Sequence, residues 1–238
     1  MFEPARPMSA PGILSDDTIS KLKKITLTSG RTRHKRHIAL RDHTIYTVAL
    51  GAGLREAEIA ALELGNTFEQ IESELRAREW VILTVFKGSK RKPKARKQAQ
   101  KKALAKKAAA PARPKTRRVY FAATVRAALE TFLAAKRARR EERIAPDAPL
   151  FAGRAGKPIS TRLLRHSFKV WQIRAQVEHS RFHNLRHTAI TRYYDMTLDP
   201  KATQDFAGHA SFATTQRYVH VRDDYRMRTV DAVAASWG

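Results

Sequence analysis

The residues best suited to chemistry are gathered in a short stretch toward the C-terminal end of the sequence. His183 and Arg186 are three positions apart, so on a helix they lie on one face. An imidazole can transfer a proton near neutral pH, and a guanidinium can fork onto the oxygens of a phosphate. His209 and Tyr218 follow in the same stretch. Together these groups are suited to nucleophilic attack on a phosphodiester.

The order and spacing of these residues resemble the catalytic domain of the tyrosine recombinases, the integrase and Xer-like family. That family carries His-x-Leu-Arg-His, then Leu-Gly-His, then Thr-x-x-Tyr-x-His. The sequence has HNLRH at 183–187, AGH at 207–209 and TQRYVH at 215–220. The departure in these motifs is Ala207, where the family usually has leucine.

An upstream segment extends the resemblance. GLREAE at 53–58 is similar to the family's Thr-Gly-Leu-Arg-x-x-Glu signature, which supplies the first catalytic arginine. The resemblance therefore implies that Arg55 belongs to the site and that Glu58 is a buried supporting carboxylate.

The family also keeps a lysine in the turn of a β-hairpin, usually within Gly-Lys-Gly. Here FKG at 86–88 follows an expected strand, which makes Lys87 the candidate. The first glycine is missing, and Lys90 lies close enough to compete for the role.

Two histidines four positions apart, His183 and His187, also suggest a zinc site. No glutamate follows the first histidine, and the charge of Arg186 between them would repel a metal ion. We therefore expect no metal or other cofactor, and we interpret His187 as a helix-packing residue behind the site.

Several tyrosines could compete as the nucleophile. Tyr193 and Tyr194 fall in an amphipathic helical stretch, where aromatic side chains usually pack in the core. Tyr225 is out of register with the family motif. Tyr218 is the predicted nucleophile.

The composition favours a polyanionic partner. The 238 residues include 47 Lys plus Arg against 22 Asp plus Glu, a formal charge of +25, which points first to double-stranded DNA. No apolar run approaches the roughly 20 residues that a membrane span needs, so no membrane partner is expected. Without cysteine there is no disulfide framework. A cytoplasmic, nucleoid-associated location fits these features.

The hydrophobic pattern predicts an α+β fold that is mainly helical, with a small antiparallel β-hairpin. A flexible tail at 1–14 precedes one catalytic domain at 15–238. Expected helices cover residues 15–24, 41–50, 54–64, 124–140, 160–175 and 222–236, and expected strands cover 79–86 and 117–121. The stretch 31–37 is a basic cluster, either a solvated loop or a phosphate contact.

A basic low-complexity insertion at 89–116 interrupts the hairpin. Residues 87–118 contain ten Lys, five Arg and no acidic residue, and such a segment cannot bury enough apolar surface to fold alone. We expect it to contact DNA phosphates through Lys90, Arg91, Lys92, Lys94, Arg96, Lys97, Lys101 and Lys102.

The resemblance implies a site-specific recombinase or integrase that breaks and rejoins DNA without ATP or metal. Tyr218 would attack a phosphate and form a 3′-phosphotyrosine, with His183 as its base and Lys87 as the acid for the leaving 5′-oxygen. Arg55 and Arg186 would clamp the phosphate oxygens, and His209 would add a hydrogen bond. A catalytically silent DNA-binding regulator and a type IB topoisomerase-like relaxing enzyme are the alternatives.

Because the catalytic signature starts by Leu54, we expect the chain to lack the DNA-binding core domain that usually precedes it in the family. We expect the basic insertion or a partner recombinase to supply that half of the DNA clamp. The resemblance further implies a tetramer on DNA. A C-terminal helix at 222–238 would dock on a neighbouring subunit or pack on its own core.

The insertion yields a prediction about salt dependence. Replacing residues 89–115 with a short Gly-Asn turn should weaken binding to all DNA sequences alike, because phosphate contacts do not read bases. If about five phosphates are contacted, the negative slope of log K against log salt should become less steep by about 4 to 5. Binding titrations at several salt concentrations measure this slope, and an unchanged slope would show that the insertion does not touch DNA.

Overall fold

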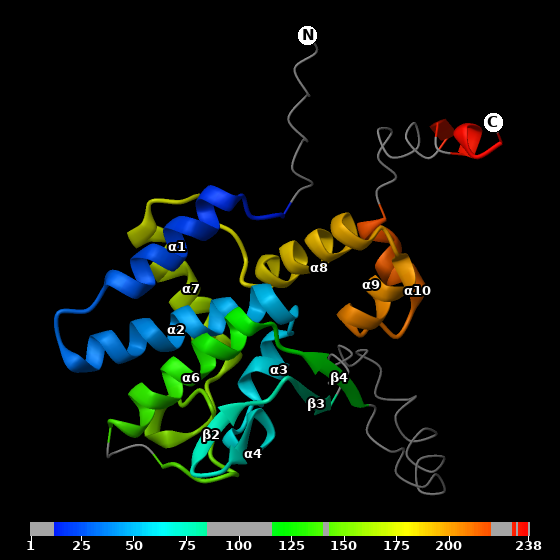
Figure 1. Cartoon of the computed structure of the whole chain (residues 1–238). Coiled ribbons are helices and arrows are strands. Elements are labelled where there is room, and N and C mark those ends of the chain that lie inside the picture. The colour runs from blue at the N-terminus through cyan, green and yellow to red at the C-terminus, as the bar shows by residue number, and fades with distance from the viewer. Residues whose placement is uncertain (1–11, 85–115, 140–142, 220–229, 232, 238) are drawn as a thin grey trace, which may run out of the picture.

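The computed structural model describes residues 12–84, 116–139, 143–219, 230–231 and 233–237 (Figure 1). Helices dominate this part of the chain, together with two small antiparallel sheets, which confirms the predicted fold class. None of the helices in these ranges is long and apolar enough to cross a lipid bilayer.

The long helix α2 (Arg33–Ala52) lies at the centre of the molecule and contacts α1 (Asp16–Thr28), α6 (Ala123–Arg137) and α8 (His183–Thr197) (Figure 1). From Ile45 to Ala52 its buried face is apolar apart from Thr47, and it forms much of the core. This burial is what stabilises the packed arrangement.

Two helices are longer than the sequence predicted. Helix α2 begins at Arg33 because the Thr32 side chain accepts a hydrogen bond from the Lys35 N–H and caps the helix. The basic cluster at 31–37 therefore belongs largely to a helix. Helix α1 continues past residue 24 to Thr28.

The expected helix at 54–64 is wrong in its length. The chain forms α3 (Glu56–Ala60), breaks, and then forms α4 (Leu64–Thr67). At the break, the backbone bonds to a distant loop instead of continuing the helix: Leu150 N–H donates to the Leu62 carbonyl, and Leu64 N–H donates to Ala148.

Strands β3 (Trp80–Thr84) and β4 (Thr116–Tyr120) pair antiparallel, as predicted, with Val81 opposite Val119. A second hairpin pairs β1 (Phe68–Ile71) with β2 (Glu74–Ala77), and the sequence analysis did not predict it. Its strands, FEQI and ELRA, have only four residues each and include Glu69, Glu74 and Ala77, whose residue types are depleted in strands.

The C-terminal part of the described chain is mainly helical, and its helices and turns carry the motif residues from His183 to Tyr218. Ser160 caps α7 (Thr161–Ala175), as predicted. Beyond α8 follow α9 (Pro200–Ala207), α10 (Phe212–Thr215) and the 3-10 turn η2 (Gln216–Tyr218), which pack together at one side of the molecule (Figure 1). The 3-10 turn η1 (Arg154–Gly156) lies in the loop before α7.

The described residues test only part of the expected domain layout. Leu14, expected in the flexible tail, is buried, and its N–H donates to Thr188 at 2.9 Å. Most of the basic insertion at 89–116 and most of the expected C-terminal helix fall outside the described residues.

Gly53 ends α2 in the left-handed region, with φ of 59°, and a Cβ there would lie 2.9 Å from the Phe206 ring. We expect Gly53→Ala to lower the free energy of unfolding by about 1–2 kcal/mol for the backbone strain, plus a further loss from the ring contact. Gly156→Ala is a matched control, because φ is 70° there and nothing lies within 4 Å of the added Cβ. Urea unfolding measures both variants, and equal losses would show that the contact with Phe206 costs nothing.

Candidate active site

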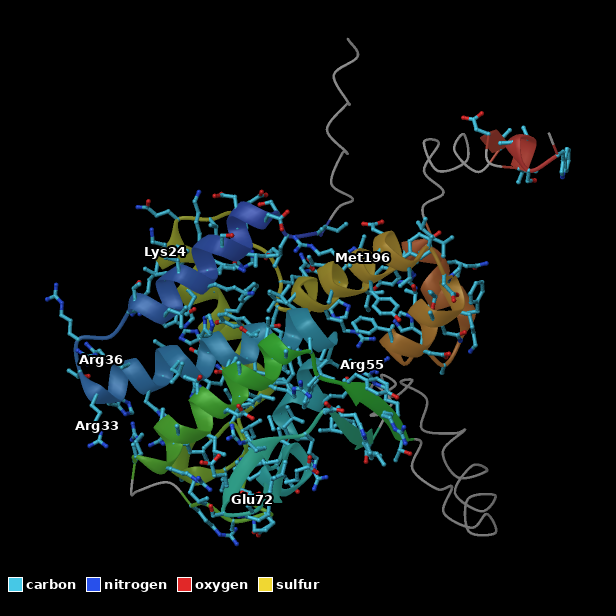
Figure 2. The ribbon with its side chains drawn as sticks, in the orientation of Figure 1. Lys24, Arg33, Arg36, Arg55, Glu72 and Met196 are labelled. Carbon is cyan, nitrogen blue, oxygen red and sulfur yellow. The ribbon has the colours of Figure 1, made fainter. Side chains whose placement is uncertain are left out.

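The site forms where α3 meets the ends of α8 and α9. Figure 2 labels Arg55 on the side of the molecule where α3 and the β3–β4 pair face α8 and α9. Arg55 is the residue before α3, His183 is the first residue of α8, and Arg186 follows one turn later. Segments far apart in the sequence are therefore brought together here.

The carboxyl end of α9 gathers three arginines. A helix leaves its last carbonyls without backbone donors, and they form the negative end of the helix dipole. The Phe206 carbonyl accepts from Arg117, and the Ala207 carbonyl accepts from Arg186. The Gly208 carbonyl, just after the helix, accepts from Arg55. The Arg117 and Arg55 bonds are both 2.9 Å long.

Arg186 is the most buried of the three, with 3% of its surface exposed. It donates to the Gly53 carbonyl as well as to Ala207, so it links the end of α2 to the end of α9. Burial, and then the charge of Arg55, lower the pKa of Arg186 to about 9. The guanidinium still carries its charge at neutral pH.

A buried carboxylate lies among these cations. Glu58 Oε1 accepts from the Arg55 guanidinium at 2.8 Å, and Oε2 accepts from Arg117 at 2.9 Å and from the Arg55 backbone N–H at 2.8 Å. Burial alone would raise the pKa of Glu58, but the hydrogen bond and charge of Arg117, followed by those of Arg55, hold it below its usual value. Glu58 is therefore ionised and fixes two guanidiniums.

Tyr218 lies in η2 and is 7% exposed. Its ring contacts two imidazoles: His187, with 5.0 Å between ring centroids and an edge-on geometry, and His209, with 5.9 Å between centroids. Burial raises the pKa of the Tyr218 phenol, while the nearby charge of Arg186 opposes this rise. The phenol therefore holds its proton at neutral pH and needs a base to become a nucleophile.

His187 lies closer to the chemistry than the sequence interpretation placed it. We expected a helix-packing residue behind the site, whereas its ring packs directly against the predicted nucleophile, Tyr218. The four-residue spacing to His183 indicated a shared face of α8, but only the placement of η2 brings Tyr218 to that face.

Two further histidines near the site, His183 and His209, are neutral at neutral pH. Burial, and then the charge of Arg186, lower the pKa of both His183 and His209, in the latter case to about 4. His209 Nδ1 lies 3.0 Å from the Thr215 hydroxyl, which fixes the ring on the turn after α9.

Arg55 and Arg186 both donate to carbonyls at the end of α9, next to His209, whose ring stacks on Tyr218. His183 lies at the start of α8, one turn before Arg186. Lys87 and its rival Lys90 lie outside the described residues, as do the other basic residues predicted to bind DNA, Arg91, Lys92, Lys94, Arg96, Lys97, Lys101 and Lys102.

Sequence reasoning missed Arg117, which it counted among the cations of the basic run. Its side chain is 8% exposed and bonded to Glu58. The period of two in β4 could have identified it, because Arg117 shares a strand face with buried Val119.

The lowered pKa of His209 predicts a pH dependence of stability. The folded-state pKa of about 4 lies below the unfolded value near 6.5, so the unfolded chain binds more protons between these pH values. Stability should therefore be full above pH 6.5 and fall as the pH drops toward 4. Because the ring is half exposed, we expect this contribution to be on the order of 1 kcal/mol.

Urea unfolding between pH 4.5 and 7.5 measures this effect. His209→Asn should flatten the slope, whereas His179→Asn, at an exposed position, serves as the control for loss of a histidine. An identical slope in the wild type and in His209→Asn would contradict the neutral state of His209.

Known proteins are similar to this chain in sequence and in fold. The chain is 38% identical over 121 residues to the tyrosine recombinase XerC of Methylobacterium sp. (strain 4-46), covering 50% of this chain and 36% of the relative. It is 27% identical over 224 residues to XerC of Proteus mirabilis, covering 93% of this chain and 59% of the relative. The chain thus spans less than two thirds of the length of these relatives.

Solved structures agree with this relationship. A crystal structure of XerA recombinase matches with a TM-score of 0.62 at 21% identity, over 97% of this chain and 66% of that one. The Tn1549 transposon integrase in complex with transposon right end DNA matches with a TM-score of 0.64 at 16% identity, over 95% of this chain and 68% of that one. The model of the phage integrase family matches residues 14–224. The chain therefore belongs to the phage integrase family.

Proposed function

We propose that this chain is a site-specific DNA recombinase that breaks and rejoins double-stranded DNA through a 3′-phosphotyrosine at Tyr218, without ATP or a metal ion. The observation that carries the proposal is the position of the Tyr218 ring against the imidazoles of His187 and His209, where the charges of Arg186 and Arg55 act on its phenol. Membership of the phage integrase family supports the same reaction.

The guanidiniums stabilise the charge of the transition state. Arg55 and Arg186 each use two nitrogens on protein acceptors, and a guanidinium has five N–H donors in a rigid fork. The remaining donors are available to the non-bridging oxygens of the phosphate. Because the protein contacts fix both groups in advance, little reorganisation is needed when negative charge develops.

Proton transfer activates the nucleophile. The Tyr218 phenol must lose its proton as it attacks, and His183, neutral because its pKa is lowered, is free to accept it. When the Thr215 hydroxyl donates to His209 Nδ1, the other ring nitrogen carries the proton and donates to the phosphate. His209 thus adds a neutral hydrogen bond to the arginine clamp.

The leaving 5′-oxygen needs a proton, and Lys87 is the proposed donor, with Lys90 as its rival. The free 5′-hydroxyl of a partner strand then reverses the reaction. Because one phosphodiester replaces another, the exchange requires no external energy source.

The formal charge of +25 supports DNA as the substrate. Structural neighbours include XerH site-specific recombinase bound to difH substrate and a lambda integrase dimer bound to a core site. We further propose that the chain works as a homo-oligomer on DNA, a tetramer with or without a partner recombinase, in the cytoplasm.

The proposal predicts that Tyr218→Phe abolishes the covalent protein–DNA adduct while DNA affinity changes by no more than about twofold. The variant keeps the ring that packs on His187 and His209 but removes the attacking oxygen. Nicked DNA that traps the adduct, followed by denaturing gel electrophoresis, measures the reaction.

Tyr193→Phe is the matched control, because it keeps the ring stacked on Phe206 and should form the adduct normally. An adduct that persists in Tyr218→Phe would transfer the role to another tyrosine, with Tyr225 first. A wild-type chain that binds DNA and never forms an adduct would be a silent regulator. Plasmid relaxation without strand exchange would favour a topoisomerase-like enzyme.

A further inference from the structure

We propose that Arg117 is a positioning residue for DNA cleavage: it holds Glu58 and the end of α9 in the geometry that aims Arg55 and His209 at the phosphate. The inference rests on the proposed recombinase function. It adds to the six predicted catalytic positions a residue of β4 that does not itself touch the substrate.

The contacts of Arg117 engage every nitrogen of its guanidinium. Nη2 and Nε face the two oxygens of Glu58 at 2.9 and 3.3 Å, and Nη1 donates to the Phe206 carbonyl at 2.9 Å. The side chain of Arg117 is 8% exposed and that of Glu58 is fully buried. A planar fork can bind a carboxylate and a carbonyl at once, whereas a lysine ammonium cannot reproduce this geometry.

These contacts join three segments that are distant in the sequence. Arg117 comes from β4, Glu58 from α3 and Phe206 from α9, and Figure 1 shows β4 between the other two elements. Glu58 in turn binds both the side chain and the backbone N–H of Arg55. The orientation of Arg55 therefore depends on a carboxylate that Arg117 holds in place.

The turn after α9 is shaped around the same side chain. Gly208 has a φ of 60°, and a Cβ there would lie 2.3 Å from the Cδ of Arg117. His209 is the next residue, so the stem of Arg117 packs under the turn that presents the imidazole. The positive charge of Arg117 also contributes to the lowered pKa of His209, after burial, Arg186 and Arg55.

Because each nitrogen of Arg117 binds Glu58 or the Phe206 carbonyl, we expect it to act on the phosphate through these neighbours. Its loss should slow cleavage while DNA affinity is retained. On nicked DNA, we expect Arg117→Met to form the adduct about 10- to 100-fold more slowly, with a Kd within about threefold of the wild type. Arg117→Lys, which keeps the charge without the fork, should recover only part of the rate.

The chain offers a matched control in Arg78. Its guanidinium also binds a carbonyl and a carboxylate, those of Phe68 at 3.2 Å and Glu69 at 3.0 Å, but in the β1–β2 region. Arg78→Met should form the adduct at the wild-type rate. Thermal unfolding of both variants shows whether a loss of rate reflects loss of the fold.

A second substrate separates positioning from general structural damage. In a methylphosphonate, a methyl group replaces one charged non-bridging oxygen of the scissile phosphate, so less charge needs stabilising. If Arg117 aims Arg55, the defect of Arg117→Met should shrink on this substrate. An equal defect on both substrates, or a wild-type rate on the ordinary one, would overturn the inference.

A measurement independent of cleavage completes the test. In ¹H–¹⁵N spectra of the free protein, Arg117→Met should shift the amide signals of Gly208 and His209, and Arg78→Met should leave them in place. If the wild type formed no adduct, the proposed function would fail, and these spectra would still decide whether Arg117 holds the turn. Unshifted amides would refute that role.

If Arg117→Met alone proves too unstable to fold, Glu58→Gln/Arg117→Met removes the unpaired buried charge. This double variant should cleave no more slowly than Glu58→Gln alone, because both residues act through one contact. A double variant with additive losses would contradict the coupling.

Discussion

The site depends on the attraction between the carboxyl end of α9 and three guanidiniums. Arg55, Arg117 and Arg186 would repel one another if they converged in a partly buried space without compensation. The carbonyl dipoles of α9 and the ionised carboxylate of Glu58 supply that compensation. Three guanidiniums and one carboxylate leave an excess of positive charge, which suits the phosphate of the proposed reaction.

The same concentration of positive charge sets the protonation of the other groups. Burial is the largest influence on His183, His209 and Tyr218, and the arginines add to it for the imidazoles and oppose it for the phenol. Neutral imidazoles and a protonated phenol are the result. The proposed reaction needs this starting state, with one histidine able to accept a proton and another able to donate a hydrogen bond.

The residues proposed for this site could be located in the sequence because each of the motifs that contain them is local. The spacing of His183 and Arg186 gives a shared helix face, and Ser160 marked the start of α7 correctly. The contacts of Arg117 could not be read in the same way, because its partners come from α3 and α9 and only the tertiary fold brings them together.

The errors in secondary structure have similar causes. The break in the expected helix at 54–64 comes from hydrogen bonds to the loop near Ala148 and Leu150. The hairpin of β1 and β2 lacks a strand-like composition and is stabilised by pairing and by packing against α4 and α6. Long-range contacts overrode local preference in both places.

The most direct test of the central claim is a structure of the Tyr218→Phe protein bound to double-stranded DNA with an intact scissile phosphate. The informative distances run from the guanidinium nitrogens of Arg55 and Arg186 to the non-bridging oxygens of that phosphate. We expect both arginines to donate to these oxygens at about 2.7–2.9 Å while they keep their bonds to the carbonyls of Gly208 and Ala207. A scissile phosphate bound away from both guanidiniums would contradict this mechanism. So would a complex in which Arg55, Arg117 and Arg186 no longer bond to the carbonyls at the end of α9.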